Sequence, residues 1–273
     1  MKNIAVADKQ PAWCPGCGNY PILKTLDEAL NELNIDRRKL VLVSGIGQAA
    51  KLPHYTKANV FNGLHGRALP AATGIKIANH ELEVVVTSGD GDMYGEGGNH
   101  FIHALRRNVG LKLFVHDNQV YGLTKGQASP TSDPGFVTKI QTHGVILQPF
   151  NPLALAIVED CSWVARSFSG TPEHLKEMMK EALNHRGGMA LLDILQPCFT
   201  FNHQNTFKWY RERVRPVDPS HDPFDRDAAF RLAMKFGDEI PVGVIYRSRR
   251  KSFESQLEAL KDGPLVSRCS AAV

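Results

Sequence analysis

The chain has 273 residues, of which 42% are hydrophobic and 22% are charged, and its formal net charge is +4. This is the composition of an ordinary folded protein, and the length allows one large domain or two small ones. Basic and acidic residues are interspersed without the basic stripe that nucleic-acid binding requires, and no apolar run reaches the ~18 residues of a membrane-spanning helix. We therefore expect neither a nucleic-acid partner nor a membrane partner.

Cysteine use predicts metal or redox chemistry. Residues 1–10 lack the apolar stretch of a signal peptide, which predicts a cytoplasmic protein in which thiols stay reduced. An odd number of cysteines also does not suit a disulfide framework. The five cysteines are Cys14, Cys17, Cys161, Cys198 and Cys269.

The spacing of apolar residues predicts alternating helices and strands after a Cys/Pro/Gly loop at residues 1–19. Such alternation is typical of an α/β fold, an open and mostly parallel sheet with helices on both faces. A segment rich in Gly, Ser, Thr and Pro, residues 120–135, predicts an ordered functional loop. In chain order we expect helix 20–33, strand 40–43, helix 66–78, strand 83–87, helix 95–107, strand 111–115, helix 152–159, strand 163–166, helix 172–185 and strand 189–194.

The C-terminal part has weaker signals. Residues 199–240 indicate irregular, partly helical structure, followed by a short strand at 240–246 at a sheet edge. A terminal helix is expected at 252–261, with a disordered tail after Gly263. We expect residues 1–200 to form the main domain with its N-terminal Cys loop, and residues 201–273 to form an extension packed on it.

The strongest chemical motif is SGDGD at residues 88–92. It follows a predicted buried strand, and Asp117 and Asn118 follow the next one. Ligands of open α/β sheets bind at the carboxyl ends of the strands, so Asp90 and Asn118 offer a carboxylate and an amide oxygen to a Mg²⁺ ion that bridges a diphosphate. The alternative is a tight turn in which Asp92 caps the following helix, and both can hold together.

The second motif is WCPGCGN at residues 13–19. Its Cys-x-x-Cys pattern presents Cys14 and Cys17 to one metal centre, and by itself it also suits a zinc site or a dithiol redox pair. Cys198 is a candidate third ligand that the fold would have to bring near. Zinc and iron–sulfur sites need a fourth ligand, and the sequence offers no obvious fourth cysteine.

Two further motifs surround the predicted metal site. In LHGR at residues 64–67, the glycine allows a backbone N–H near a helix start to face an anion, and His65 is a candidate for phosphate contact or proton transfer. The alternative is a structural histidine bonded to a turn carbonyl. The loop YGLTKGQASPT at residues 121–131 follows Asn118 and should cover whatever the metal holds. Lys125 in this loop is a candidate for a substrate carboxylate, with an exposed surface lysine as the alternative.

Together these motifs resemble the β subunit of the 2-oxoacid:ferredoxin oxidoreductases, which are thiamine diphosphate enzymes. The resemblance extends from Trp13 to about Cys198, with a weaker echo at residues 240–246, and so covers most of the chain. The Gly-Asp-Gly motif with Asn118 is common to thiamine diphosphate enzymes, whereas its pairing with CPGCG and HGR is much more specific. The loop at residues 125–131 is more similar to the 2-oxoglutarate-type branch than to the pyruvate-type branch.

The resemblance implies a thiamine diphosphate-binding fold and a set of cofactor contacts. Mg²⁺ would be held by Asp90, Asn118 and the backbone carbonyl of Val120, and Lys125 would face the 2-oxoacid. The residues that would surround the diphosphate are Gly89, Gly91, Asp92, Gly122, Leu123 and Thr124. Those that would line the rest of the cofactor pocket are Ile46, Gly47 and His65.

The resemblance also implies an activity and partners. The enzyme would convert a 2-oxoacid, expected to be 2-oxoglutarate, and coenzyme A to an acyl-CoA and CO₂, and could run the reverse reductive carboxylation. Electrons would pass through a [4Fe–4S] cluster on Cys14, Cys17 and Cys198 to ferredoxin. A separate α subunit would supply the pyrimidine-binding domain, giving an αβ dimer or a dimer of such dimers with the active site at the interface.

The sequence departs from the family pattern at Gln48, where a fourth cluster cysteine is usual. Three explanations are open: a [4Fe–4S] cluster with a non-cysteine fourth ligand or water, a three-iron cluster, or a replacement ligand such as Cys161 or His54. Because Cys161 has apolar neighbours, we interpret it as a core residue. Our hypothesis is ligation by three cysteines.

Two other functions remain possible from the sequence. One is a thiamine diphosphate-dependent decarboxylase or synthase subunit whose Cys-x-x-Cys motif binds zinc. The other is a non-catalytic electron-transfer or scaffold subunit. An Asp90→Ala substitution separates a catalytic site from a scaffold, because only the former loses activity.

Overall fold

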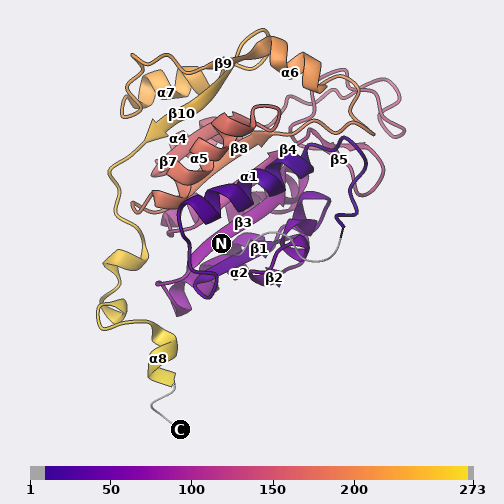
Figure 1. The fold of residues 1–273 in the computed structure, drawn as a ribbon. Helices are drawn as coiled ribbons and strands as arrows, with labels where there is room; N and C mark the ends of the chain where they lie inside the picture. Colours follow the sequence, from indigo (N-terminus) through magenta and orange to yellow (C-terminus); the bar gives the residue numbers. More distant parts are fainter. Residues whose placement is uncertain (1–9, 270–273) are drawn as a thin grey trace.

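The computed structural model describes residues 10–269 (Figure 1). The start of the predicted Cys loop, residues 1–9, and the end of the predicted tail, residues 270–273, lie outside the described residues. The central feature is an eight-stranded sheet with the order β2-β1-β3-β4-β8-β7-β10-β9. Its strands are β1 (Leu40–Ser44), β2 (Asn59–Asn62), β3 (Glu83–Gly89), β4 (Lys112–Asp117), β7 (Trp163–Phe168), β8 (Ala190–Leu195), β9 (Val214–Pro216) and β10 (Ile240–Arg247).

All neighbouring strands of the sheet are parallel except β7 and β10, so β10 and β9 run opposite to the other six. A separate antiparallel pair, β5 (Val120–Tyr121) and β6 (Gln127–Ala128), lies in the loop after β4. The prediction of an open, mostly parallel α/β sheet is therefore confirmed. No helix among residues 10–269 is long and apolar enough to cross a membrane.

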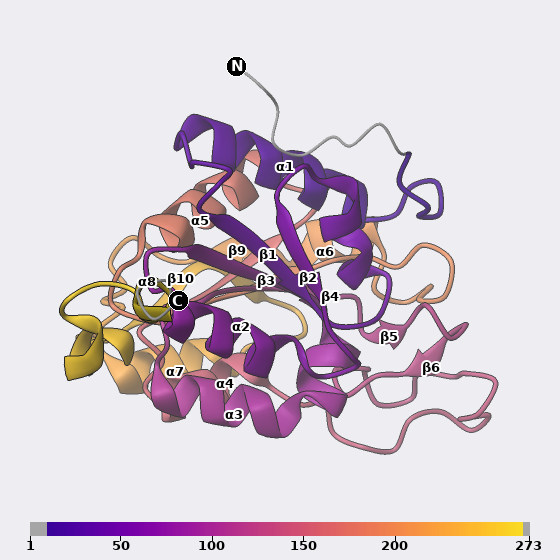
Figure 2. The ribbon, with the colours of Figure 1, turned by 90° about the horizontal axis from the view of Figure 1, so that it is seen from below.

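Helices cover both faces of the sheet (Figure 2). Alternate side chains of the central strands point to opposite faces, so Val84 and Val86 pack in one core and Val85 packs in the other. The helices over the Val85 face are α1 (Asn19–Glu32) and α5 (Pro172–Asn184). Those over the other face are α2 (Ala68–Ala78), α3 (Gly98–Arg107), α4 (Pro152–Val158) and α7 (Arg226–Ala233). This explains why the central strands are apolar on both sides.

The C-terminal residues extend the same sheet. The predicted edge position of strand 240–246 is wrong, because β10 lies between β7 and the three-residue strand β9. Next to these strands, α6 (Phe207–Arg213) buries Tyr210 in a small core. Neither β9 nor β2 was predicted, since segments of three and four residues are too short to show an apolar period.

The predicted helix at 252–261 is also wrong. Two short 3-10 turns, Glu254–Gln256 and Glu258–Leu260, take its place. The backbone N–H of Gly110 donates to the Glu254 carboxylate, at 3.2 and 3.1 Å to its two oxygens, and such tertiary contacts replace continuous helical bonding. A short helix, α8 (Leu265–Cys269), occupies part of the predicted tail.

The arrangement of the central strands positions the site. The strands β1, β3, β4 and β8 are neighbours and run in one direction, so their carboxyl ends meet at one edge. A 3-10 helix (Ala49–Tyr55) follows the first of these ends, and a π-helical segment (Gly91–Glu96) follows the second. Four short segments therefore meet at this edge, which is where ligands bind in open α/β sheets. They are GIGQ at residues 45–48, GDGD at 89–92, DNQ at 117–119 and QPC at 196–198.

Candidate active site

All of the predicted cofactor-binding residues line one pocket at the carboxyl edge of the sheet. The pocket also includes three residues that were not in that set. Its lining is Ile46, Gly47, Gln48, Ala49, His65, Gly89, Asp90, Gly91, Asp92, Asn118, Val120, Tyr121, Gly122, Leu123 and Thr124. Tertiary folding therefore gathers four separate segments around a single cavity.

Asp90 is a buried carboxylate at the base of this pocket, with 1% of its surface exposed. Its Oδ2 accepts hydrogen bonds from the hydroxyls of Ser129 and Thr131, the latter at 2.7 Å. Burial raises the pKa of Asp90 to about 6, although these two hydroxyl donors act in the opposite direction. Both hydroxyls bond Oδ2, and Oδ1 accepts only one long hydrogen bond, from the backbone N–H of Asn118 at 3.5 Å. Oδ1 is therefore the carboxylate oxygen with bonding capacity left for a cation.

Thr131 bridges two buried carboxyl groups. Its Oγ1 lies 2.7 Å from Oδ2 of Asp90 and 2.8 Å from Oδ1 of Asp117. A threonine hydroxyl has one proton, so the two carboxyl groups either share it or one of them carries a proton of its own. Burial is the main reason why the pKa of Asp117 is also raised, and the nearby charges of Asp193 and Asp90 add to the shift.

Asn118 has its side-chain orientation fixed by its neighbours. Its Oδ1 accepts a hydrogen bond from the backbone N–H of Val120 at 3.0 Å, and its Nδ2 donates to Oε1 of Gln196 at 3.2 Å. The amide oxygen therefore lies on the side of Val120, whose backbone carbonyl was the third predicted Mg²⁺ ligand. The oxygen-rich set of Asp90, Asn118 and Val120 fits the preferences of Mg²⁺.

Asp92 connects two loops and the end of β3 rather than capping a helix. Its Oδ1 accepts hydrogen bonds from the backbone N–H groups of Ile46 (3.0 Å) and Gly66 (2.8 Å) and contacts Nδ1 of His65 at 2.6 Å. Its Oδ2 accepts from the Ser88 hydroxyl at 2.6 Å. The anion that the Gly66 N–H faces is thus the Asp92 carboxylate, and α3 begins only at Gly98 without a side-chain cap.

The two predicted catalytic residues differ in their placement. His65 lines the pocket, and besides its contact to Asp92 its Nε2 lies 3.6 Å from Oε2 of Glu96. Lys125 is exposed and does not line the pocket, but it directly follows Leu123 and Thr124, which do. Its backbone φ of +84° is uncommon for a residue with a side chain and belongs to the turn after β5.

The three predicted cluster cysteines line one small adjoining pocket, together with Gln48. Burial raises the pKa of Cys17 to about 11 and also raises that of Cys198, and in both cases the charge of nearby Cys14 adds to the effect. The three thiols are free cysteines. Asn118, Gly122 and Gln48 line both this pocket and the predicted cofactor pocket, so the two are direct neighbours.

Three cysteine thiols that line one pocket are donors that suit an iron–sulfur cluster. No group of three or more His, Cys, Asp or Glu side chains among residues 10–269 is close enough to hold one metal ion. Oε1 of Gln48 is buried without a hydrogen-bond partner, as expected of a side chain that faces a bound group.

Comparisons with known proteins identify the family. Residues 44–194 match the family described as thiamine pyrophosphate enzyme, C-terminal TPP binding domain, and residues 198–262 match the C terminal of the pyruvate ferredoxin oxidoreductase beta subunit. The chain is 44% identical to 2-oxoacid:ferredoxin oxidoreductase 2, subunit beta, of Aeropyrum pernix, over 92% of this chain and 85% of that relative. The chain belongs to the family of 2-oxoacid:ferredoxin oxidoreductase β subunits.

More specific relatives are also similar to this β subunit. The 2-oxoglutarate synthase subunit KorB of Archaeoglobus fulgidus is 40% identical over 76% of this chain and 73% of that relative. The solved 2-oxoglutarate:ferredoxin oxidoreductase of Magnetococcus marinus, with 2-oxoglutarate, coenzyme A and succinyl-CoA bound, is 37% identical. It covers 94% of this chain and 88% of its own, with a TM-score of 0.91. The expected thiamine diphosphate-binding fold is therefore confirmed.

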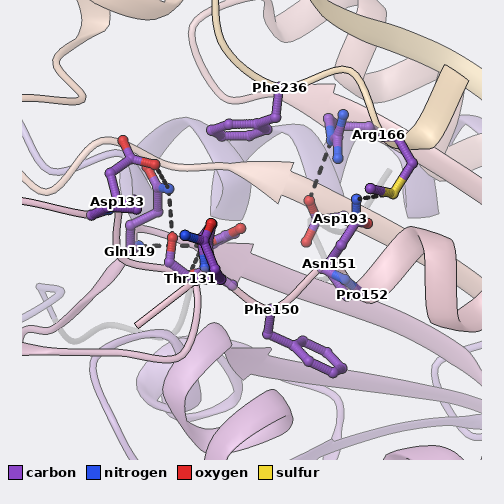
Figure 3. A pocket seen from close by; sticks show the side chains of 14 residues that line it. Gln119, Thr131, Asp133, Phe150, Asn151, Pro152, Arg166, Asp193 and Phe236 are labelled. Atoms are coloured by element: carbon purple, nitrogen blue, oxygen red, sulfur yellow. Dashed lines mark hydrogen bonds and ion pairs between the residues drawn. The ribbon is translucent and has the colours of Figure 1, made fainter. Parts of the chain in front are cut away.

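A third cavity, of about 410 Å³, is lined by Asp117 and Thr131 among others and shares no lining residue with the cofactor pocket of this β subunit (Figure 3). Asp193 accepts a hydrogen bond from the Tyr94 hydroxyl at 2.9 Å and forms an ion pair with Nε of Arg166 at 3.6 Å. Figure 3 shows Phe236 on one side of these residues, and the Arg166 guanidinium carbon lies 5.5 Å from its ring centre. A buried ion pair thus adjoins the Asp117 carboxyl group, which Thr131 connects to Asp90 of the predicted metal site.

Sequence reasoning missed several residues of this β subunit's site. Arg166 and Asp193 lie inside apolar strands, and a charged residue in such a strand is a signal that indicates a buried pair. Ser129 and Thr131 belong to a predicted loop motif, but no role was predicted for their hydroxyl groups. Gln196 has no sequence signal of its own beyond preceding the Pro-Cys pair at 197–198.

Proposed function

We propose that this β subunit belongs to an oxidoreductase of the 2-oxoglutarate type. It would work with an α subunit, coenzyme A and ferredoxin in the oxidative decarboxylation of 2-oxoglutarate, and in the reverse reductive carboxylation. The observation that carries the proposal is the direct contact between two pockets, one lined by every predicted cofactor residue and the other by three cysteines. The names of the KorB relatives and of the Magnetococcus marinus structure support the 2-oxoglutarate branch.

The oxygen donors would hold the cofactor in this proposal. Asp90, Asn118 and the Val120 carbonyl would bind Mg²⁺, which would anchor the diphosphate of thiamine diphosphate against the glycines of the GDG motif. The cofactor, when bound, supplies the electron sink for decarboxylation. Asp92 would hold the loops of Ile46 and His65 in place around it, and His65 would contact the cofactor from the pocket wall. Lys125 would approach the substrate carboxylate from the rim.

The cysteine pocket would form the electron exit. Cys14, Cys17 and Cys198 would ligate an iron–sulfur cluster, and Gln48 would occupy the corner where a fourth cysteine is usual. We infer ligation by three cysteines because the unpartnered Oε1 of Gln48 lies in this pocket and Cys161 lies fully buried in the apolar core. Four thiolate ligands in the assembled protein would contradict this part of the proposal.

The test uses the chain co-expressed with an α-type partner and purified without oxygen. Thiamine diphosphate, magnesium, iron and sulfide are quantified, and coenzyme A-dependent reduction of ferredoxin is measured with 2-oxoglutarate, pyruvate and 2-oxobutyrate. We expect bound iron and sulfide, a requirement for both thiamine diphosphate and coenzyme A, and the highest kcat/KM with 2-oxoglutarate. Zinc in place of iron would favour the decarboxylase alternative, and turnover by the β chain alone would contradict the need for a partner.

Two variants assign roles within this experiment. Asp90→Ala should abolish activity and cofactor retention, whereas unchanged activity would indicate a scaffold subunit. Lys125→Met should raise the KM for 2-oxoglutarate more than it changes kcat. Lys208→Met, which removes an exposed lysine from α6, is the matched control and should behave like the wild type.

A further inference from the structure

Gln196 lies between the two pockets of the proposed site. It directly follows β8 and has 1% of its surface exposed. Its backbone N–H donates to the Asp117 carbonyl at 2.8 Å, which fixes the residue beside the end of β4. Its side chain lines the cysteine pocket and also contacts Asn118 of the cofactor pocket. This buried amide can therefore affect both the orientation of Asn118 and the surroundings of the cysteine sulfurs.

The hydrogen bonds determine which way this amide points. The Val120 N–H donates to Oδ1 of Asn118, so Nδ2 of Asn118 is a donor, and the atom that it meets on Gln196 must be the acceptor Oε1. Nε2 of Gln196 then donates to the carbonyl of Pro197 at 2.8 Å and to Sγ of Cys17 at 3.8 Å. Every polar atom of the Gln196 amide is thus used, with its N–H directed at the cysteine sulfur.

The packing of the cysteine loop depends on this side chain. A Cβ atom at Gly18 would lie 2.8 Å from Cγ and 2.9 Å from Nε2 of Gln196, closer than real Cβ contacts. The glycine after the second cysteine therefore allows the loop to lie directly on the Gln196 amide. This close approach brings Cys17 within reach of its N–H.

We propose that Gln196 is a positioning residue that orients the metal-binding amide of Asn118 and tunes the reduction potential of a cluster bound at Cys17. The inference rests on the proposed function. An N–H that donates to a cluster sulfur stabilises the reduced form, which carries one more negative charge, and so raises the reduction potential. The same side chain accepts the Nδ2 proton of Asn118 and keeps that residue's Oδ1 facing the metal.

The first experiment replaces the amide by an apolar side chain of similar length, Gln196→Met, in the assembled complex. Its cluster potential is measured by an EPR-monitored redox titration, and thiamine diphosphate binding is measured at increasing Mg²⁺. We expect a shift of the potential to more negative values. We also expect cofactor binding about fivefold weaker, as for the loss of one neutral hydrogen bond.

The variant Gln196→Glu separates the two effects and has nearly the same shape as glutamine. It retains an acceptor for Asn118, removes the N–H donors and adds a negative charge when ionised. The potential should therefore fall at least as far as in Gln196→Met, while cofactor binding stays close to that of the wild type. If the Gln196→Met complex does not assemble, the cluster potential and cofactor binding of Gln196→Glu still test the proposal. Ser169→Ala is the control, because the buried Ser169 hydroxyl lies in the same region without a hydrogen-bond partner.

The outcomes distinguish this inference from the proposed function. A wild-type complex that contains a cluster, with the same potential in both Gln196 variants, overturns the inference and leaves the proposed function intact. An equal shift in Ser169→Ala also overturns it, since the effect would then be one of packing. A wild-type complex without iron overturns the proposed function and this inference together.

Discussion

Asp92 should be the side chain on which the pocket walls depend most. Its carboxylate accepts hydrogen bonds from the backbone of two loops and from Ser88, and it contacts the His65 ring. With 3% of its surface exposed, little water can replace it. The change Asp92→Ala leaves the N–H groups of Ile46 and Gly66 without an acceptor.

The cost follows from these contacts. A buried donor left unsatisfied costs ~1–3 kcal/mol, and two such donors together with the lost Ser88 and His65 contacts give a loss of about 3–6 kcal/mol in the free energy of unfolding. This is a large part of the ~5–15 kcal/mol that stabilises a typical protein. At about 2 °C per kcal/mol, Tm should fall by roughly 6–12 °C. Asp92→Asn keeps one acceptor oxygen and should lose only ~1–2 kcal/mol.

Two measurements on the purified chain check this prediction. Thermal unfolding gives the order wild type, Asp92→Asn, Asp92→Ala in decreasing Tm. Hydrogen–deuterium exchange of peptides that cover residues 42–50 and 62–70 should be at least about tenfold faster in Asp92→Ala, since ~1.4 kcal/mol corresponds to tenfold. The asparagine variant should remain protected in both peptides.

The reasoning would be refuted by an Asp92→Ala protein that unfolds at the wild-type temperature with unchanged exchange in both peptides. Faster exchange spread evenly over the whole chain would also count against it, because the contacts predict a local effect on two loops.

Three other substitutions or measurements follow from the structure. Thr131→Val removes a hydroxyl donor to the Asp90 carboxylate and should weaken Mg²⁺ binding, measured by calorimetric titration, by roughly tenfold. The control Thr87→Val should show no such loss, because the buried Thr87 hydroxyl has no hydrogen-bond partner. Gly66→Ala should lower the free energy of unfolding by at least about 2 kcal/mol, because φ is +70° and a Cβ would lie 2.4 Å from the Glu96 backbone; a wild-type urea midpoint would speak against it. In the metal-free chain, iodoacetamide should label the exposed Cys14 first and Cys161 only on unfolding. The thiolate is the reactive form, and burial raises the pKa of Cys161 to about 12. Equal labelling rates of the two cysteines, measured by mass spectrometry, would contradict this prediction.

The sequence by itself determined most strands of the central sheet and the helices between them. Continuous apolar runs such as residues 84–86 indicate strands buried on both faces, and helical spacing marks the helices between them. Because parallel strands place their carboxyl ends at one edge, this pattern also determined that the motifs around Asp90 and Asn118 would meet. Local patterns were enough for these features, since each lies within a short segment.

Only the tertiary structure decided how the side chains of the site connect. The contact between Gln196 and Cys17 joins residues separated by 179 positions, and that between Gln196 and Asn118 joins residues separated by 78. The hydrogen bond from Thr131 to Asp90 and the one from the Ile46 N–H to Asp92 likewise join residues that are far apart in the sequence, and no apolar periodicity predicts them. The same holds for β9 and β10, whose places in the sheet are set by pairing with distant strands. A hydrogen bond depends on the positions of two atoms in space, and local sequence patterns report only which face of its own element a residue occupies.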